Sequence, residues 1–156
     1  MGRSSNVSDN IIKLLATGLF TGYMPYASGT AGTALAVFFY WLLPVKAGIY
    51  WLILIVLFIG GTALCSQAEK LFGEKDSSKI VIDEICGYFI TMAFLPKTLF
   101  FIVAGFFIFR FFDIVKLPFI RRSEKLEGGL GIMLDDVLAG MMGSMVLHII
   151  RWLFRI

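Results

Sequence analysis

The chain has 156 residues, of which 58% are apolar and only 16% are charged. This composition is typical of a membrane protein and excludes an ordinary soluble domain, whose charged fraction is larger. The formal net charge is +3. The basic residues flank apolar segments instead of forming basic runs interleaved with aromatics, so we expect a membrane partner and no nucleic acid. The length fits a single domain over residues 1–156.

The N-terminal part of the chain is polar at first and then amphipathic. Residues 1–10 carry mostly polar side chains, and the short segment 11–20 (IIKLLATGLF) is expected to lie in the membrane interface. The pattern of a cleavable signal peptide is not apparent, so the membrane segments are expected to act as their own insertion signals. Residues 21–33 are rich in glycine, serine and threonine and predict a loop.

Five apolar segments follow, and each predicts a membrane-embedded helix. They cover residues 34–43, 49–64, 80–95, 98–112 and 134–154, the last of which follows a predicted glycine-rich loop at 127–133. Three are barely long enough, because about 15 helical residues cover only ~22 Å of a hydrocarbon layer of ~30 Å. The expected fold class is all-α: a polytopic helical membrane protein with four to five membrane-embedded helices plus an N-terminal amphipathic helix. The spacing of Gly140 and Ser144 predicts close packing of the last helix.

The cysteines and the single histidine do not indicate a metal or redox site. Cys65 and Cys86 lie in apolar stretches without CxxC spacing or a nearby histidine. They predict two buried thiols, with neither a disulfide nor a zinc site. His148 lies deep in the last segment, at the opposite end from the acidic residues, and we expect it to be structural or interfacial.

Charge is distributed unequally between the two sides of the predicted bundle. If the five segments alternate across the bilayer, one side holds ten of the 14 lysines and arginines and all 11 acidic residues. The positive-inside rule makes this side cytoplasmic. Because acidic residues contribute little to orientation, their one-sided placement indicates a functional surface that faces the cytoplasm.

Six of the acidic residues border apolar sequence, and they are Asp76, Asp83, Glu84, Asp113, Asp135 and Asp136. Carboxylates at membrane depth are costly unless they are paired or bind a metal, which makes each a candidate functional group. Oxygen ligands without cysteine or histidine favour Mg2+ over zinc or copper. The alternative is that acids at helix starts cap free N–H groups, although one cap needs only one acid of an adjacent pair.

Groups that could hold a phosphate lie near these acids. Arg110, Asp113 and Lys116 recur every three residues. On a helix they would share roughly one face, either as two cations that bind a phosphate or as a salt-bridged surface. The hydroxyl-bearing loop is expected to open a helix whose free N–H groups could bind an anion. Its hydroxyl groups belong to Ser28, Thr30 and Thr33.

Four blocks of sequence carry a family resemblance. They read GTAGT at 29–33, DSSKIVIDEICG at 76–87, FRFFDIVKLP at 109–118 and GGLGIMLDDVLAG at 128–140. In this order they resemble the phosphatidylglycerophosphatase A family, with one departure at Ser28, where many members are expected to have proline. The resemblance implies a Mg2+-dependent membrane phosphatase of bacteria. Such an enzyme removes the terminal phosphate from phosphatidylglycerophosphate to give phosphatidylglycerol, the last step in that lipid's synthesis.

The residues and the resemblance together assign roles to positions in this chain. Family motif positions fall on Thr30, Asp76, Asp83, Glu84, Arg110, Asp113, Lys116, Asp135 and Asp136. The expected catalytic carboxylates are Asp83, Glu84, Asp113, Asp135 and Asp136. The expected Mg2+ ligands are Asp76, Asp83, Glu84, Asp135 and Asp136. The expected substrate contacts are Ser28, Thr30, Thr33, Arg110 and Lys116.

These assignments predict a multi-pass protein of the bacterial cytoplasmic (inner) membrane, with its active site facing the cytoplasm. A small ion- or proton-coupled transporter is the alternative, because intramembrane carboxylates also mark ion pathways. It would require acids near the middle of the bilayer and inverted repeats, and the sequence has neither. An assembly or scaffold subunit would tolerate the loss of single carboxylates. Within the phosphatase hypothesis, direct attack by water and an aspartyl-phosphate intermediate are both open.

Overall fold

A computed structural model describes residues 6–43, 46–118, 120–123 and 126–155. Within these ranges every regular element is a helix, which confirms the all-α class. The elements are α1 (Val7–Ala16), the 3-10 turn η1 (Thr21–Tyr23), α2 (Ser28–Leu42), α3 (Ala47–Phe72), α4 (Ile82–Thr91), α5 (Leu99–Val115), α6 (Ile120–Ser123) and α7 (Gly129–Phe154). Three charged residues expected on the cytoplasmic side lie outside the described residues, and they are Arg3, Glu124 and Lys125.

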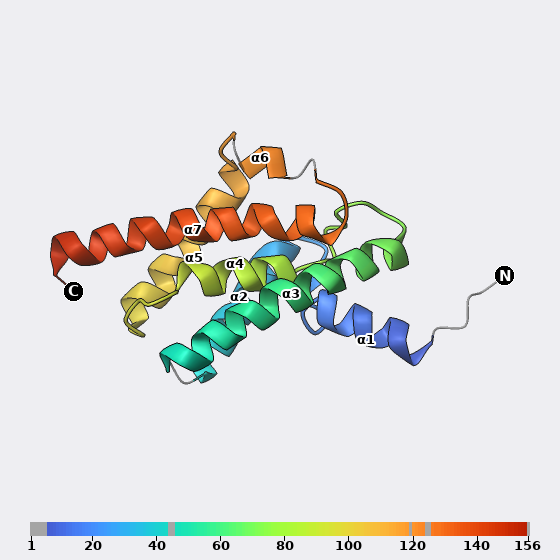
Figure 1. Ribbon diagram of the computed structural model, residues 1–156, viewed down its shortest axis with the longest axis horizontal. Helices are drawn as coiled ribbons and strands as arrows, with labels where there is room; N and C mark the ends of the chain where they lie inside the picture. Colours follow the sequence, from blue (N-terminus) through green and yellow to red (C-terminus); the bar gives the residue numbers. More distant parts are fainter. Residues whose placement is uncertain (1–5, 44–45, 119, 124–125, 156) are drawn as a thin grey trace.

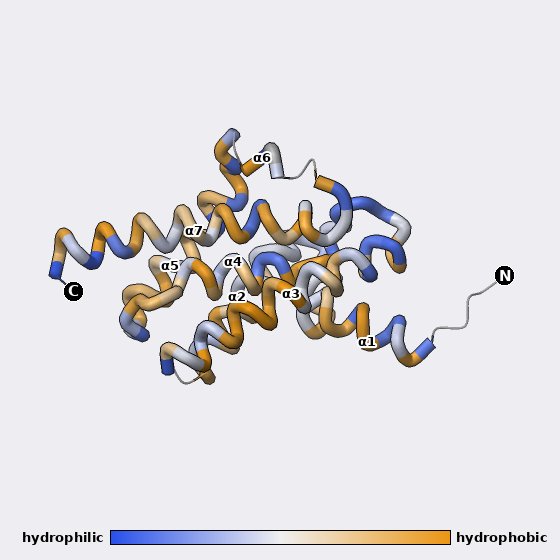
Figure 2. Tube along the Cα trace, in the orientation of Figure 1, coloured by the Kyte–Doolittle hydropathy of each residue, from blue (hydrophilic) through white to orange (hydrophobic). Residues whose placement is uncertain are grey.

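The helices α2, α3, α4, α5 and α7 form an elongated bundle (Figure 1). The α3–α4 loop and α1 lie at one end, at the right in Figure 1. The end of α2, the start of α3, the α4–α5 connection and the end of α7 lie at the opposite end. Figure 2 shows apolar residues along the bundle helices and a concentration of hydrophilic residues in the α3–α4 loop and at the start of α4. The chain therefore gathers polarity at one end of an apolar bundle, as the sequence predicts.

Helix length separates two members of the bundle from the rest. With 26 residues each, α3 and α7 are the described helices long and apolar enough to cross a membrane. By contrast, α2 has 15 residues, α4 has 10 and α5 has 17. At 1.5 Å per residue, α4 is only ~15 Å long, about half of a hydrocarbon layer. Two membrane-length helices are thus established, and the four to five embedded helices stay a prediction.

Two segments that the sequence predicts as loops are helical. Residues 28–33 form the first turns of α2, and residues 129–133 form the first turns of α7. Glycine lowers helix propensity, which made both segments resemble loops. Here the glycines permit close packing: a Cβ at Gly129 would lie 2.0 Å from the carbonyl oxygen of Thr62. Consequently Asp135 and Asp136 lie about two turns inside α7 and not at its start.

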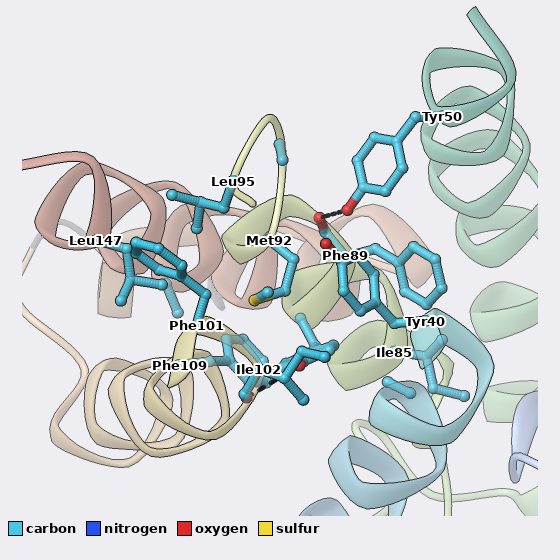
Figure 3. Packing of buried hydrophobic residues seen from close by; sticks show 14 of the residues in the cluster. Tyr40, Tyr50, Ile85, Phe89, Met92, Leu95, Phe101, Ile102, Phe109 and Leu147 are labelled. Atoms are coloured by element: carbon cyan, nitrogen blue, oxygen red, sulfur yellow. Dashed lines mark hydrogen bonds between the residues drawn. The ribbon is translucent and has the colours of Figure 1, made fainter. Parts of the chain in front are cut away.

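The short helix α4 ends inside the bundle, at the buried residue Thr91, where backbone carbonyls have little access to water. Side chains of the long helices provide hydrogen-bond donors there, as an apolar environment requires. The Tyr50 hydroxyl of α3 donates to the Phe89 carbonyl at 2.5 Å (Figure 3). On α7, Nε2 of His148 lies 3.0 Å from the Ala93 carbonyl oxygen. This contact with the backbone agrees with the structural or interfacial role expected for His148.

The core between the bundle helices is apolar and aromatic. Phe101 and Phe109 of α5 and Leu147 of α7 are almost fully buried beside α4 (Figure 3). Cys65 and Cys86 are also buried, and both are free thiols. The prediction of two buried, unpaired cysteines is therefore confirmed.

The helices α4 and α7 pack extensively against each other, with direct contact between their backbones. A Cβ at Gly140 would lie only 2.3 Å from the carbonyl oxygen of Gly87. One turn further along, the Thr91 hydroxyl donates to the Gly140 carbonyl at 3.3 Å. The close approach predicted for the last helix is thus confirmed. About one turn after these glycines, Thr91 of α4 also lies beside Gly143 of α7. The two helices therefore run in the same direction.

We predict that Gly140→Ala destabilises the protein by about 1–3 kcal/mol, because the added methyl group would overpack the α4–α7 contact. The control is Gly60→Ala on α3, where a Cβ would meet no atom within 4 Å. Replacing a helical glycine by alanine there should stabilise by up to ~1 kcal/mol. Thermal unfolding in detergent would measure both. A Gly140→Ala protein that melts at or above the wild-type temperature would contradict the packing argument.

Candidate active site

A cleft of about 550 Å³ opens at the polar end of the bundle. It is bordered by the start of α2, the α3–α4 loop, the start of α4, the end of α5 and the second turn of α7. The six acids that border apolar sequence all line it, and they are Asp76, Asp83, Glu84, Asp113, Asp135 and Asp136. The fold thus brings together carboxylates that are up to 60 positions apart in the chain.

Three of these carboxylates form a tight cluster. Oxygen atoms of Asp83, Glu84 and Asp136, one from each, lie within 4.8 Å of one another. Asp83 lies four residues before Gly87, and Asp136 lies four residues before Gly140. Because α4 and α7 run in the same direction, the two acids lie side by side, each about one helical turn before the contact between the glycines. The backbone contact therefore sets the distance between the acids.

Several oxygens of the cleft have no hydrogen-bond partner among the described residues. They are Oδ1 of Asp83, Oε2 of Glu84 and Oδ1 of Asp135. Asp83 and Asp136 are less than one-tenth exposed. Burying unpaired carboxylates in this way costs several kcal/mol unless a cation or proton compensates them.

Two cations of α5 and its C-terminal cap enter the cleft. Nη1 of Arg110 lies 2.5 Å from Oδ2 of Asp113 and 4.0 Å from Oε1 of Glu84. The sequence predicts that Lys116 shares a helical face with Arg110 and Asp113. Instead Lys116 is the cap residue after α5, with a φ of 41°, and does not continue that face. The left-handed backbone turns its side chain toward α7, where Nζ donates to Oδ2 of Asp135 at 2.6 Å.

The cleft carries a large negative excess. Six carboxylates line it, against the two cationic side chains of Arg110 and Lys116. The cluster brings carboxylate oxygens together from two helices, and some of these oxygens have no hydrogen-bond partner among the described residues. The described residues of the cluster offer no nitrogen or sulfur ligand. Such a set of hard oxygen ligands suits a divalent cation such as Mg2+. The donor set of this chain therefore fits the metal that the sequence predicts.

The start of α2 closes the cleft on the side of Arg110. A Cβ at Gly29 would lie 2.3 Å from Oε1 of Glu84 and 2.8 Å from Nη1 of Arg110, so only glycine lets this turn approach the charged groups. Ser28 also lines the cleft. No side chain caps the N-terminus of α2, which leaves first-turn N–H groups free for an anion.

The structure does not bring every predicted phosphate-binding residue to the cleft. Thr30 and Thr33 are not among its lining residues. Thr33 is fully buried, and its hydroxyl donates to the Gly29 carbonyl at 2.8 Å, which ties it to the helix backbone. The sequence predicted an accessible Thr33 because residues 28–33 were expected to form a loop. The roles of Thr30 and Thr33 in phosphate binding stay predictions.

Sequence reasoning missed several residues that line the cleft: Met24, Pro25, Ala27, Ser77, Ser78, Ile80 and Ile114. Ser77 and Ser78 could have been found, because they directly follow Asp76 in one of the four sequence blocks. The apolar residues carried no such signal. The capping alternative fails for Asp135 and Asp136, because the first turn of α7 contains no acidic residue.

We predict that Arg110→Gln lowers the free energy of unfolding by ~3 kcal/mol, since it leaves Asp113 and Glu84 buried without their cation. In the double variant with Asp113→Asn, the loss should be smaller than the sum of the single losses by at least ~1 kcal/mol. Denaturant titrations in detergent would give this double-mutant cycle. Lys70→Gln, which removes an exposed cation of α3, is the control and should change stability little. Strictly additive losses would argue against the ion pair.

The chain is similar to known proteins over most of its length. The family model of phosphatidylglycerophosphatase A matches residues 14–151. A phosphatidylglycerophosphatase A of Haemophilus influenzae is 42% identical over 150 residues, covering 92% of this chain and 90% of that protein. One of Escherichia coli is 36% identical over 140 residues, covering 88% and 81%. A Bacteroides thetaiotaomicron protein with the provisional name phosphatidylinositol-3-phosphatase is 38% identical over 149 residues, covering 89% and 92%. No solved structure matches the chain.

Proposed function

The chain belongs to the phosphatidylglycerophosphatase A family, and from this premise we propose that it hydrolyses phosphatidylglycerophosphate to phosphatidylglycerol and inorganic phosphate. The reaction class is that of a phosphoric monoester hydrolase. The observation that carries the proposal is the cleft, in which six carboxylates and two cations surround a space of about 550 Å³ at one end of an apolar bundle. A lipid in the bilayer could extend a phosphorylated headgroup into such a cleft.

We further propose that Mg2+ is required and that Asp83, Glu84 and Asp136 hold it. The unpaired oxygens of the cluster and its negative excess support this assignment. Asp135 could add Oδ1, because Lys116 engages its other oxygen. Asp76, also predicted as a ligand, borders the same cleft. A bound divalent cation would offset the charge of the phosphate and favour ionisation of an attacking water.

The chain's own groups would orient the phosphate and stabilise its charge. Arg110 is held by Asp113 beside the start of α2, where it could bind phosphoryl oxygens together with the free N–H groups of that helix. Lys116, held by Asp135, would add a second positive charge. In the hydrolysis a P–O bond forms to water, the bond between phosphorus and the glycerol oxygen breaks, and that oxygen takes up a proton. A cleft carboxylate could accept the proton that water gives up.

For the membrane arrangement we propose four to five embedded helices, with α4 and α5 packed against the membrane-length helix α7, α4 also against α3, and α2 against α4 and α5. The cleft would face the cytoplasm of a bacterial cell at the inner membrane, as the positive-inside rule predicts. A transporter is not favoured, because the carboxylates gather at one end of the bundle and the relatives carry phosphatase names.

We predict that phosphate release from phosphatidylglycerophosphate requires Mg2+ and falls at least ~100-fold in Asp83→Asn and in Asp136→Asn, equivalent to ~2.7 kcal/mol of transition-state stabilisation. The purified protein in detergent would be assayed with Mg2+ and with chelator. Glu127→Gln removes an exposed acid outside the cleft and should keep wild-type activity. A folded wild type that releases no phosphate would refute the proposed reaction, and activity that survives both substitutions would refute the metal assignment.

The same assay should include phosphatidylinositol 3-phosphate, because one relative is named for that substrate. We expect the higher kcat/KM with phosphatidylglycerophosphate, the substrate named by the family model and the other two relatives. A phosphoenzyme trapped by acid quench would favour an aspartyl-phosphate intermediate over direct attack by water.

We predict that Mg2+ raises the melting temperature of the wild type, because a ligand that binds only the folded state stabilises it by ~2.7 kcal/mol at 100 times its Kd. Asp83→Asn and Asp136→Asn should lose most of this shift, whereas Glu127→Gln should retain it. The melting curves require no substrate and therefore test the metal site independently of the reaction. An equal shift in wild type and both asparagine variants would place the ion elsewhere.

A further inference from the structure

A second cavity lies on the apolar surface between α2 and α5. It has a volume of about 290 Å³ and is lined by Ala34, Val37, Ile102, Val103, Phe106 and Phe107. We call this cavity the α2–α5 groove. Val103 and Phe107 are 45% and 66% exposed, so the groove is open to the apolar surroundings of the bundle.

The α2–α5 groove continues the face of α5 that enters the cleft. Phe106, Arg110 and Ile114 are spaced four residues apart, so they follow one another along one side of the helix. Arg110 and Ile114 line the cleft, whereas Phe106 lines the groove. Ile114 is 69% exposed and lies where the cleft meets the apolar surface. One helix face therefore changes from charged to apolar within a single turn.

On the opposite side, α2 shows the same change. Ser28 and Gly29 line the cleft, and Ala34 and Val37 line the groove. At 1.5 Å per residue, the groove begins about 4.5 Å from the cleft along α5, from Arg110 to Phe107, and about 7.5 Å along α2, from Gly29 to Ala34. Thr30 lies between the two sites in sequence and shares the face of Ala34, four residues later. The separation leaves room for the polar part of a lipid between its phosphate and its acyl chains.

We propose that the α2–α5 groove seats an acyl chain of the lipid phosphate whose headgroup occupies the cleft, so that the substrate enters sideways between α2 and α5. The inference rests on the proposed function and adds a site for the apolar part of the substrate. The occupant follows from continuity: both helices that form the groove also supply residues to the cleft. A larger groove of about 690 Å³ lies between α3 and α7, with Ile90 of α4 in its lining. Its α4 and α7 sides also supply cleft residues, but α3 supplies no described residue to the cleft.

The expected contribution of the groove is moderate. A chain in the bilayer is already in an apolar medium, so its transfer to the groove gains no hydrophobic free energy from leaving water. The gain comes from packing contacts and from holding the headgroup in the orientation that the reaction requires. We therefore expect effects of about 10-fold on kcat/KM and not the far larger effects of removing a carboxylate.

The test compares two substrates with the same phosphoglycerophosphate headgroup, one with two oleoyl chains and one water-soluble with two butanoyl chains. Val103→Trp should fill the groove from α5 and lower kcat/KM for the long-chain lipid about 10-fold, with little change for the soluble substrate. Ala34→Trp, which fills it from α2, is a second variant in case the first fails to fold. Ile55→Trp is the matched control: a β-branched residue, 51% exposed, in the α3–α7 groove. It should leave both substrates unaffected.

Equal losses on both substrates, no loss on either, or the same long-chain defect in Ile55→Trp would overturn the proposal. A readout that does not depend on catalysis separates it from the proposed function. A phosphatidylglycerophosphate with a photoreactive diazirine in its acyl chain should crosslink to α2 and α5. An excess of phosphatidylglycerophosphate without the diazirine should suppress this labelling, whereas phosphatidylcholine should not. If the wild type labels in this way yet hydrolyses neither substrate, the proposed reaction fails while the groove stands. Equal labelling of α3 and α7 would overturn the groove.

Discussion

The contact between Gly87 of α4 and Gly140 of α7 is the constraint on which the rest of the structure depends. Neither position has room for a Cβ, so the two backbones meet directly. Since the helices run in the same direction, Asp83 and Asp136, each four residues earlier, are brought within reach of one ion. Helices kept apart by larger side chains would leave these acids too far apart to share a ligand.

Holding the acids together creates an electrostatic cost that the surroundings only partly offset. Arg110 pairs with Asp113, and Lys116 pairs with Asp135, while buried oxygens of Asp83 and Glu84 stay without a partner. Unpaired buried carboxylates lower the stability of the folded state. In the proposed metal site, the same arrangement would hold the ligands in place before an ion binds, so that little reorganisation would be needed.

The short helix α4 links the site to the opposite end of the bundle. Ten residues take it from the carboxylates to a turn within the bundle. There Tyr50 of α3 contacts the carbonyl of Phe89 in α4, and His148 of α7 contacts that of Ala93 just beyond the helix. These hydrogen bonds fix α4 between the two membrane-length helices, and α4 in turn positions Asp83 and Glu84. The site therefore depends on contacts at the far end of the bundle as well as on its own residues.

The sequence by itself determined the membrane class, the helical fold, the family and the acids of the cleft, because composition, apolar segment length and local motifs are properties of the chain alone. It misplaced the starts of α2 and α7, since glycine is common both in loops and where helices pack closely. Only the tertiary structure decided that Asp83, Glu84 and Asp136 form one cluster, that Lys116 reaches Asp135, and that Thr33 serves the backbone. Distances between side chains on different helices follow from how the helices pack, which no local pattern records.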